Sequence, residues 1–249
     1  MEPWQIVLLG VLGVVAGWLN VMAGGGSMLT VPVMVFMGLP APVANGTNRI
    51  GILVEGAAAV FTFFRKGYSD FKLSLSLAAV ACLGAVIGAQ LGVNLDGEWF
   101  NRFLAVVIVG VMILMATGHD KADEAAEKPL TRSRLIWGHV LMVGAGFWGG
   151  LIQVGVGFIL MPVLHRVMGL DMVRMNMHKV FIVMSYTSVA LIIFASQVEI
   201  YWSAGIALAI GMAAGGWLGA HSTIKHGATW IRRVLYVTLT VFCMKLLFG

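Results

Sequence analysis

Long apolar segments separated by short polar ones dominate the chain. They occur at eight places, at residues 4–23, 46–65, 73–94, 103–118, 136–153, 177–197, 201–219 and 232–248. A helix that spans a bilayer needs about 20 predominantly apolar residues. The pattern therefore predicts an all-α, polytopic helical membrane protein.

Two shorter apolar runs interrupt this pattern. Ser27–Gly38 and Gly157–Met168 hold 12 residues each, about 18 Å of helix against a hydrocarbon core of roughly 30 Å. Each contains a proline, Pro32 or Pro162. Short apolar segments of this kind, at matching places in two halves of a chain, are typical of the discontinuous helices of transporters. We therefore expect two short discontinuous helices near the midplane of the bilayer.

A weak internal repeat relates the two halves. Ala16-Gly17-Trp18 matches Ala145-Gly146-Phe147, and a Gly-xxx-Gly series beginning at Gly84 matches one beginning at Gly211. With about five membrane segments in each copy, an odd number, the two repeats must be inverted relative to each other. The predicted organisation is a first transmembrane repeat at 1–118, a cytoplasmic linker at 119–135 and a second transmembrane repeat at 136–249.

Basic residues indicate the orientation. If both short segments cross the membrane, most Lys and Arg residues lie on one side, in the loops 65–72, 119–134, 165–179 and 220–233. If the short segments only dip in and return, this bias disappears. The positive-inside rule thus favours ten crossings with both termini outside the cytoplasm.

Composition narrows the function classes. The chain is 59% hydrophobic and 11% charged, against about 45–50% and about 25% in soluble domains, which excludes an ordinary soluble enzyme. We attribute the excess of basic residues to the loops and expect no nucleic-acid partner. Cys82 and Cys243 lie in apolar runs and no metal-binding spacing occurs, so we expect no metal and no cofactor. The expected partners are the lipid bilayer and, if the Gly-xxx-Gly faces pack between two copies, a homodimer.

Glycines at the two interruptions form the first candidate site. Gly24-Gly25-Gly26-Ser27 precedes the first short segment, and Gln153-Val154-Gly155-Val156-Gly157 holds the equivalent place in the second repeat. Glycines there expose backbone N–H groups at the start of a short helix, where an anion is favoured. The alternative is that they only permit close helix packing, as we expect for the series at Gly84 and Gly211.

Polar and cationic residues after each short segment form the second candidate site. They are Asn45, Thr47, Asn48 and Arg49 in the first repeat and Asn176, His178 and Lys179 in the second. A charge at membrane depth costs roughly 2.5–3.5 kcal/mol on insertion scales and so indicates function. We expect Arg49 and Lys179 to approach one anion from opposite sides, unless they snorkel to the nearer interface.

Two further residues complete the candidate set. Asn20, at the end of the first long run, is a candidate binding residue. Glu55 is the only acidic residue inside a long apolar run. It is either a coupling residue, since a buried carboxylate readily binds a proton, or a structural partner of Arg49. Ser185 and Tyr186 lie near the equivalent position of the second repeat, so a carboxylate function would be asymmetric.

The segment from Ala16 to Pro32, followed by Gly38-Leu39-Pro40 and by Ala44 to Asn48, resembles the sulfite exporter TauE/SafE family of integral membrane permeases. The resemblance covers nearly the whole chain. It implies transport of small sulfur-containing anions, such as sulfite or organosulfonates like sulfoacetate, across a bacterial inner membrane, which would make the termini periplasmic. Arg49 departs from the small or hydroxyl residue frequent at that place in the family, and an added cation fits an anionic substrate.

The leading hypothesis is a transporter, most simply an exporter, that works by alternating access of two inverted halves. An anion channel built on the same halves is the alternative. A further alternative, an intramembrane serine hydrolase with Ser27 as nucleophile and His178 as base, is disfavoured because no glycine follows Ser27 and no oxyanion donor can be identified. We therefore expect no catalytic residues and no enzyme.

Overall fold

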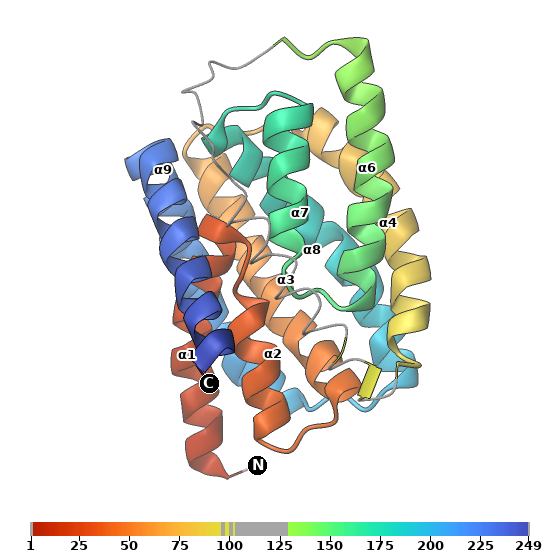
Figure 1. Cartoon of the computed structure of the whole chain (residues 1–249), viewed down its shortest axis with the longest axis vertical. Coiled ribbons are helices and arrows are strands. Elements are labelled where there is room, and N and C mark those ends of the chain that lie inside the picture. The colour runs from red at the N-terminus through yellow and green to blue at the C-terminus, as the bar shows by residue number, and fades with distance from the viewer. Residues whose placement is uncertain (1, 96–97, 100–101, 103–128, 249) are drawn as a thin grey trace.

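The structure is a computed structural model that describes residues 2–95, 98–99, 102 and 129–248, with the side chains of 227–229, 231–236 and 238–248 left aside. Its elements are helices (Figure 1): α1 (Pro3–Ala23), α2 (Ser27–Phe36), α3 (Ala41–Arg65), α4 (Phe71–Gly92), α6 (Arg132–Leu151), α7 (Val156–Pro162), the π-helical turn η1 (Val163–Val167), α8 (Met172–Gln197) and α9 (Trp202–Phe248). The all-α fold class is confirmed. The predicted run at 103–118 and most of the linker lie outside the described residues.

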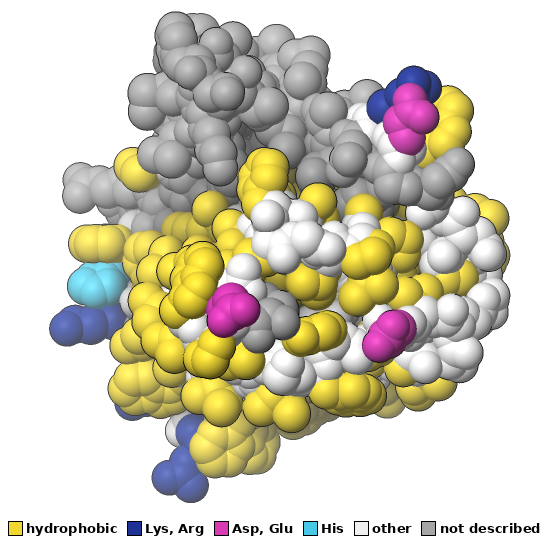
Figure 2. Space-filling model, turned by 90° about the horizontal axis from the view of Figure 1, so that it is seen from below, with side chains coloured by type: hydrophobic (Ala, Val, Ile, Leu, Met, Phe, Trp, Pro, Cys, Tyr) yellow, Lys and Arg dark blue, Asp and Glu magenta, His cyan; other side chains and the backbone are white. Residues whose placement is uncertain are grey.

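Several helices have the length and composition of membrane spans. Within the described residues these are Pro3–Ala23, Phe71–Gly92, Met172–Gln197 and the part of α9 from Trp202 to His226. Their outer faces carry large apolar side chains that are largely exposed, such as Val11, Leu83 and Ile210. A view onto the end that holds the N-terminus shows apolar side chains over much of the described surface (Figure 2). The chain is a multi-pass membrane protein.

Two helix boundaries differ from the sequence prediction. The predicted loop at 220–233 is helical within α9, which extends to Phe248. The ribbon turns back in this region, so that the last part of α9 runs down to the C-terminus (Figure 1). That loop was inferred from its basic residues, but these residues and the neighbouring apolar ones are compatible with a helix, and no proline interrupts the segment. In addition, α6 begins at Arg132, inside the predicted linker, because the Thr131 side chain caps it by accepting a hydrogen bond from the Arg134 N–H.

The helices of the two halves pack in matching pairs. α1 lies against α9, and α6 lies against α4. α3 also contacts α9, α8 also contacts α4, and α3 and α8 contact each other. Exchanging α1 with α6, α3 with α8 and α4 with α9 leaves this set of contacts unchanged. Each half therefore packs chiefly against helices of the other half.

The Gly-xxx-Gly series lie at the contacts of α4 with α6 and of α9 with α1. A Cβ at Gly84 or Gly88 of α4 would overlap backbone atoms of α6 at Val143 and Phe147. A Cβ at Gly211 of α9 would overlap the Gly10 carbonyl of α1 in the same way. The expected packing role is confirmed, and these contacts lie within one chain.

The two short segments are helices that follow sharp interruptions. Gly24, with φ 77°, ends α1, and three residues later α2 begins. In the second half, Gln153 and Gly155 have φ of 67° and 72° between α6 and α7. η1 follows Pro162, whose ring removes one N–H from the helical ladder. Figure 1 shows α2 in the lower half of the molecule and α7 in the upper half. The predicted discontinuous helices are present, the second as α7 with η1.

Candidate functional site

The two interruptions meet at Gly24 and Gly157. A Cβ on either glycine would overlap the Cα of the other, so the two backbones are in direct contact. Gly26 is equally confined, since a Cβ there would overlap the Ala16 carbonyl. Close packing, the alternative given for these glycines, therefore applies to Gly24, Gly26 and Gly157. We call the region around this contact the central junction.

Lys179 of α8 binds the end of α1 at the central junction. Its Nζ lies 3.2 Å from the carbonyl oxygen of Asn20 and 2.6 Å from that of Val21. Both carbonyls belong to the last turn of α1, but the Asn20 carbonyl also accepts from the Gly24 N–H at 2.8 Å. The Val21 carbonyl is one of those for which the helix no longer supplies an N–H donor. A cation at a helix C-terminus is also favoured by the helix dipole. Lys179 thus caps the interrupted helix of the other half.

Arg49 of α3 does the same for α6. Its Nη1 donates to the Gly149 carbonyl at 3.0 Å and its Nη2 to the Gly150 carbonyl at 2.5 Å. Nη1 also lies 3.4 Å from Gln153 Oε1, and the guanidinium stands 4.4 Å from the centre of the Phe194 ring. Arg49 is 0% and Lys179 2% exposed, so the snorkelling alternative is wrong for both.

Glu55 is bound to Asn20 rather than to Arg49. Asn20 Nδ2 lies 3.0 and 3.1 Å from the two carboxylate oxygens, and Asn20 Oδ1 accepts from the Gly26 N–H at 3.3 Å. Asn20 therefore links the carboxylate of α3 to the start of α2. The hydrogen bonds of Arg49 go to α6 and Gln153, so the proposed Glu55–Arg49 partnership is replaced by Glu55–Asn20.

A small cavity lies between Glu55 and Lys179. It is also lined by Asn20, Gly24 and Gly157, and it has room for about one water molecule. Within the described residues, the ion pairs are formed by Arg102 with Glu98 and by Arg174 with Asp171, away from the junction. Glu55 and Lys179 therefore face the same small space without a direct ion pair.

The other predicted polar residues lie in buried contacts between helices. Asn48 Nδ2 donates to Ser27 Oγ at 3.2 Å, Asn45 Nδ2 to the Leu151 carbonyl at 3.0 Å and Asn176 Nδ2 to Thr223 Oγ1 at 3.4 Å. Asn45 and Asn176 each keep an Oδ1 without a partner among the described residues. Thr47 Oγ1 accepts from the Tyr201 N–H at 3.1 Å, which directs it to the start of α9.

His178 and Ser27 have different partners. His178 Nδ1 lies 2.8 Å from Ser74 Oγ of α4, whereas Ser27 accepts from Asn48. The structure does not form the Ser27–His178 pair that a serine hydrolase would require.

Sequence reasoning missed two residues of these clusters. Thr30 donates to Asn48 Oδ1 at 2.6 Å, and as a hydroxyl residue within a short apolar segment it could have been found. Phe194 lies against the Arg49 guanidinium, and it gives no signal in the sequence because aromatic residues are common in apolar helices. Tyr186, noted near the position equivalent to Glu55, packs against Gly149.

A family model described as "Sulfite exporter TauE/SafE" matches residues 9–246. The chain belongs to this family. The match includes both interruptions, both buried cations and Glu55. The resemblance stated from the motif around Gly24–Ser27 is therefore confirmed over nearly the whole chain.

Curated relatives in the same comparison are named as membrane transporters. The chain is 24% identical to the probable membrane transporter protein ORF9 of a Sinorhizobium species, over 97% of this chain and 92% of the relative. It is 24% identical to a probable membrane transporter protein of Haemophilus influenzae, over 98% and 94%. It is 23% identical to the probable membrane transporter protein YfcA of Escherichia coli K12, over 97% and 90%. No solved structure matches the chain.

Proposed function

We propose that this TauE/SafE protein exports small sulfur-containing anions, such as sulfite or organosulfonates like sulfoacetate, across a bacterial inner membrane. One structural observation carries the proposal: two interrupted helices meet at Gly24 and Gly157, and each is capped by a buried cation of the other half. The family description supports the chemical class of the substrate. Discontinuous helices at the midplane support a transport site.

Electrostatics favours an anion at the central junction. Two buried cations, Arg49 and Lys179, accompany one buried carboxylate, Glu55. With both cations protonated, the region carries a net positive charge even when Glu55 is ionised. The N-terminus of α2 has no side-chain cap and adds a positive dipole end. The proposed binding residues are Asn20, Gly24, Gly25, Gly26, Ser27, Asn45, Thr47, Asn48, Arg49, Gln153, Gly155, Gly157, Asn176, His178 and Lys179.

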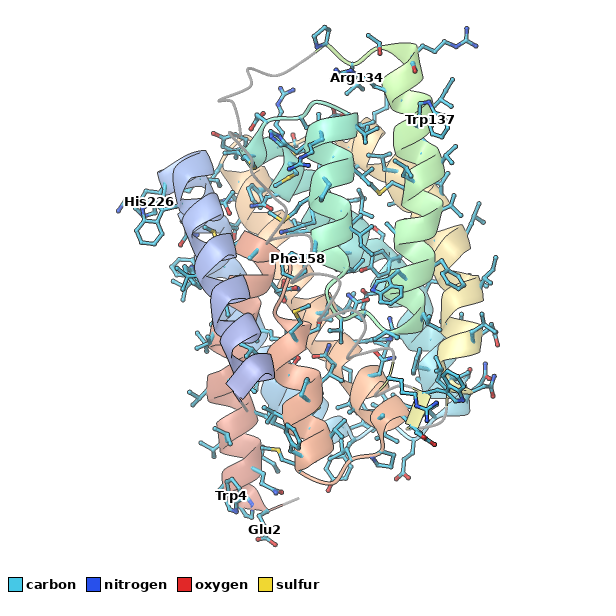
Figure 3. The ribbon with its side chains drawn as sticks, viewed as in Figure 1. Glu2, Trp4, Arg134, Trp137, Phe158 and His226 are labelled. Atoms are coloured by element: carbon cyan, nitrogen blue, oxygen red, sulfur yellow. The ribbon has the colours of Figure 1, made fainter. Side chains whose placement is uncertain are left out.

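Alternating access by two inverted halves is the proposed mechanism. The reciprocal helix contacts and the placement of α2 and α7 on opposite sides of the middle support it. Figure 3 shows Glu2 and Arg134 at opposite ends of the molecule, as ten crossings with periplasmic termini and a cytoplasmic linker require. At the end that holds the N-terminus, acidic side chains face the viewer and most basic ones stand at the edge (Figure 2), which supports the same orientation.

Binding and flux of defined anions test the proposal. Sulfite, sulfoacetate and acetate are added separately to the purified protein while its melting temperature is recorded. A ligand at 100 times its dissociation constant adds about 2.7 kcal/mol of stability, so a sulfur-containing substrate raises the melting temperature, whereas acetate does not. No shift with either sulfur anion, together with no flux of either into proteoliposomes, would reject the substrate class.

Counterflow separates a carrier from the alternative of an anion channel. In a carrier, unlabelled anion inside the proteoliposome accelerates entry of labelled anion, and the flux saturates. A pore would instead give currents that rise linearly with voltage and no acceleration by internal anion.

A further inference from the structure

We propose that Glu55 is the proton-binding site of this transporter, and that one proton enters the Glu55–Asn20–Lys179 cluster together with the transported anion. This inference rests on the proposed function, because it concerns what accompanies the anion through the central junction. It assigns a coupling ion, the proton, to a single side chain.

The surroundings of Glu55 offer its carboxylate few hydrogen-bond donors. The side chain is buried, with 2% of the residue exposed. Its hydrogen-bond donor among the described residues is one amide group, Asn20 Nδ2, shared between both oxygens. An ionised carboxylate away from water normally needs a paired cation and several donors. A site with one shared donor can therefore hold the carboxyl group with or without a proton.

The second half of the molecule serves as an internal control. Arg49 caps the end of α6 as Lys179 caps the end of α1, yet among the described residues no carboxylate forms an ion pair with Arg49. At the position that matches Asn20 stands Gly149, and the ring of Tyr186 fills the space beside it. Capping an interrupted helix therefore does not require an acid. The two helix caps therefore do not account for the presence of a carboxylate at Glu55.

Lys179 is the charged group that shares a cavity with Glu55. From α8, Tyr186 also lies within electrostatic range of the carboxylate. α1 presents the neutral Asn20, α7 contributes Val156 and Gly157 to the shared cavity, and α9 presents the backbone at Gly216. Arg49, on the same helix as Glu55, is bound to α6. The protonation state of Glu55 therefore depends mainly on the charge of Lys179 and of any anion bound beside it.

Anion binding and proton binding are linked through this arrangement. An anion attracted to Lys179 places a second negative charge near Glu55 and so favours the neutral carboxyl group. By reciprocity, a protonated Glu55 binds the anion more tightly. The carboxylate takes one proton from water on the loading side and returns it to water on the other side. A monovalent anion then crosses without net charge, and export proceeds while its concentration ratio exceeds the opposing pH gradient.

Proton uptake can be measured directly by calorimetry. Sulfoacetate, which does not itself titrate near neutral pH, is titrated into the purified protein in buffers that differ in ionisation enthalpy, so that the number of protons taken up per anion is obtained. We expect about one proton for wild type and for Glu199→Gln, which removes an exposed carboxylate. We expect none for Glu55→Gln, whose amide oxygen can still accept from Asn20. Equal proton uptake by wild type and Glu55→Gln would overturn the proposal.

A second measurement tests the proton site without any anion. Infrared spectra of the protein are recorded as a function of pH, and the carbonyl band of a protonated carboxylic acid is followed. We expect a band that titrates in wild type and in Glu199→Gln and is missing in Glu55→Gln. A spectrum unaffected by Glu55→Gln would reject the proton site even if anions bind. A titrating Glu55 band in a protein that binds neither sulfite nor sulfoacetate would instead retain the proton site and reject the substrate class.

Discussion

The ammonium group of Lys179 lies 2.6 Å from the carbonyl oxygen of Val21. A cation of the second half therefore caps a helix of the first half. The guanidinium of Arg49 makes the reverse connection to the carbonyl oxygens of Gly149 and Gly150. Neither cation is placed by its own half alone. Each interrupted helix therefore depends on a side chain of the other half for hydrogen bonds at its last turn.

Replacing either cap by an apolar residue is expected to destabilise the protein. Arg49→Met leaves the Gly149 and Gly150 carbonyls buried without these donors, and each unsatisfied group costs about 1–3 kcal/mol. Lys179→Met does the same at Val21, whereas the Asn20 carbonyl still accepts from the Gly24 N–H. Thermal unfolding in detergent measures the effect. Arg102→Met, at a side chain that is 59% exposed, is the control and should change stability by less than about 0.5 kcal/mol. Equal melting temperatures for all three variants would contradict the capping role.

Anion affinity is expected to fall when either buried cation is neutralised. Arg49→Gln and Lys179→Gln retain hydrogen-bonding capacity but remove a positive charge from the central junction. An interaction of a charged group worth roughly 1.5–3 kcal/mol corresponds to about ten- to hundredfold in dissociation constant. Calorimetry with sulfite provides the value, and Arg102→Gln serves as the surface control. Wild-type affinity in both variants would remove the cations from the binding site, and loss in only one would make the site asymmetric.

Two glycines of the α4–α6 pair should respond oppositely to alanine. In Gly88→Ala the new methyl group would overlap the Phe147 carbonyl, so the helices must separate and the melting temperature falls. Gly144→Ala meets nothing within 4 Å and gains helix propensity of up to about 1 kcal/mol, so stability is unchanged or higher. Thermal unfolding of both variants decides the point. A similar loss in both would mean that the Gly-xxx-Gly contact is not what limits stability.

Cysteine labelling tests the orientation. In a background without Cys82 and Cys243, Ser69→Cys and Ser196→Cys place single thiols at exposed positions near opposite ends of α4 and α8. If the basic loop at 65–72 is cytoplasmic, an impermeant maleimide added to intact cells labels Ser196→Cys only. In inside-out vesicles it labels Ser69→Cys only. The reverse pattern would invert the proposed topology.

Local sequence patterns predicted much of this fold because they depend on composition and spacing. The long runs of apolar residues predicted the long helices, and the two short runs beginning at Ser27 and Gly157 predicted the short helices after the interruptions. Glycines at four-residue intervals predicted the α4–α6 contact correctly, since close approach of backbones requires small residues. The segment 220–233 was predicted as a loop but is helical, because basic residues mark a membrane boundary without ending a helix.

The partners of the buried polar residues could not be predicted in the same way. Glu55 lies 35 residues from Asn20 and only six from Arg49, yet its hydrogen bonds go to Asn20, because α1 and α3 place these side chains together. Likewise, the carbonyls that Arg49 binds lie about 100 residues away. Every backbone has carbonyls, so the sequence does not show which ones a helix end will leave unpaired. Such pairings follow from tertiary packing alone.

The contact between Gly24 and Gly157 restricts how this protein can vary. Most tightly packed positions tolerate a larger residue when a neighbour becomes smaller, and such compensating pairs are found together in genetic screens. Here both members already lack a side chain, so neither can shrink to accommodate the other. In a saturation mutagenesis screen for function, these two positions should therefore accept glycine only, and no second-site substitution at the partner should rescue a change at either one.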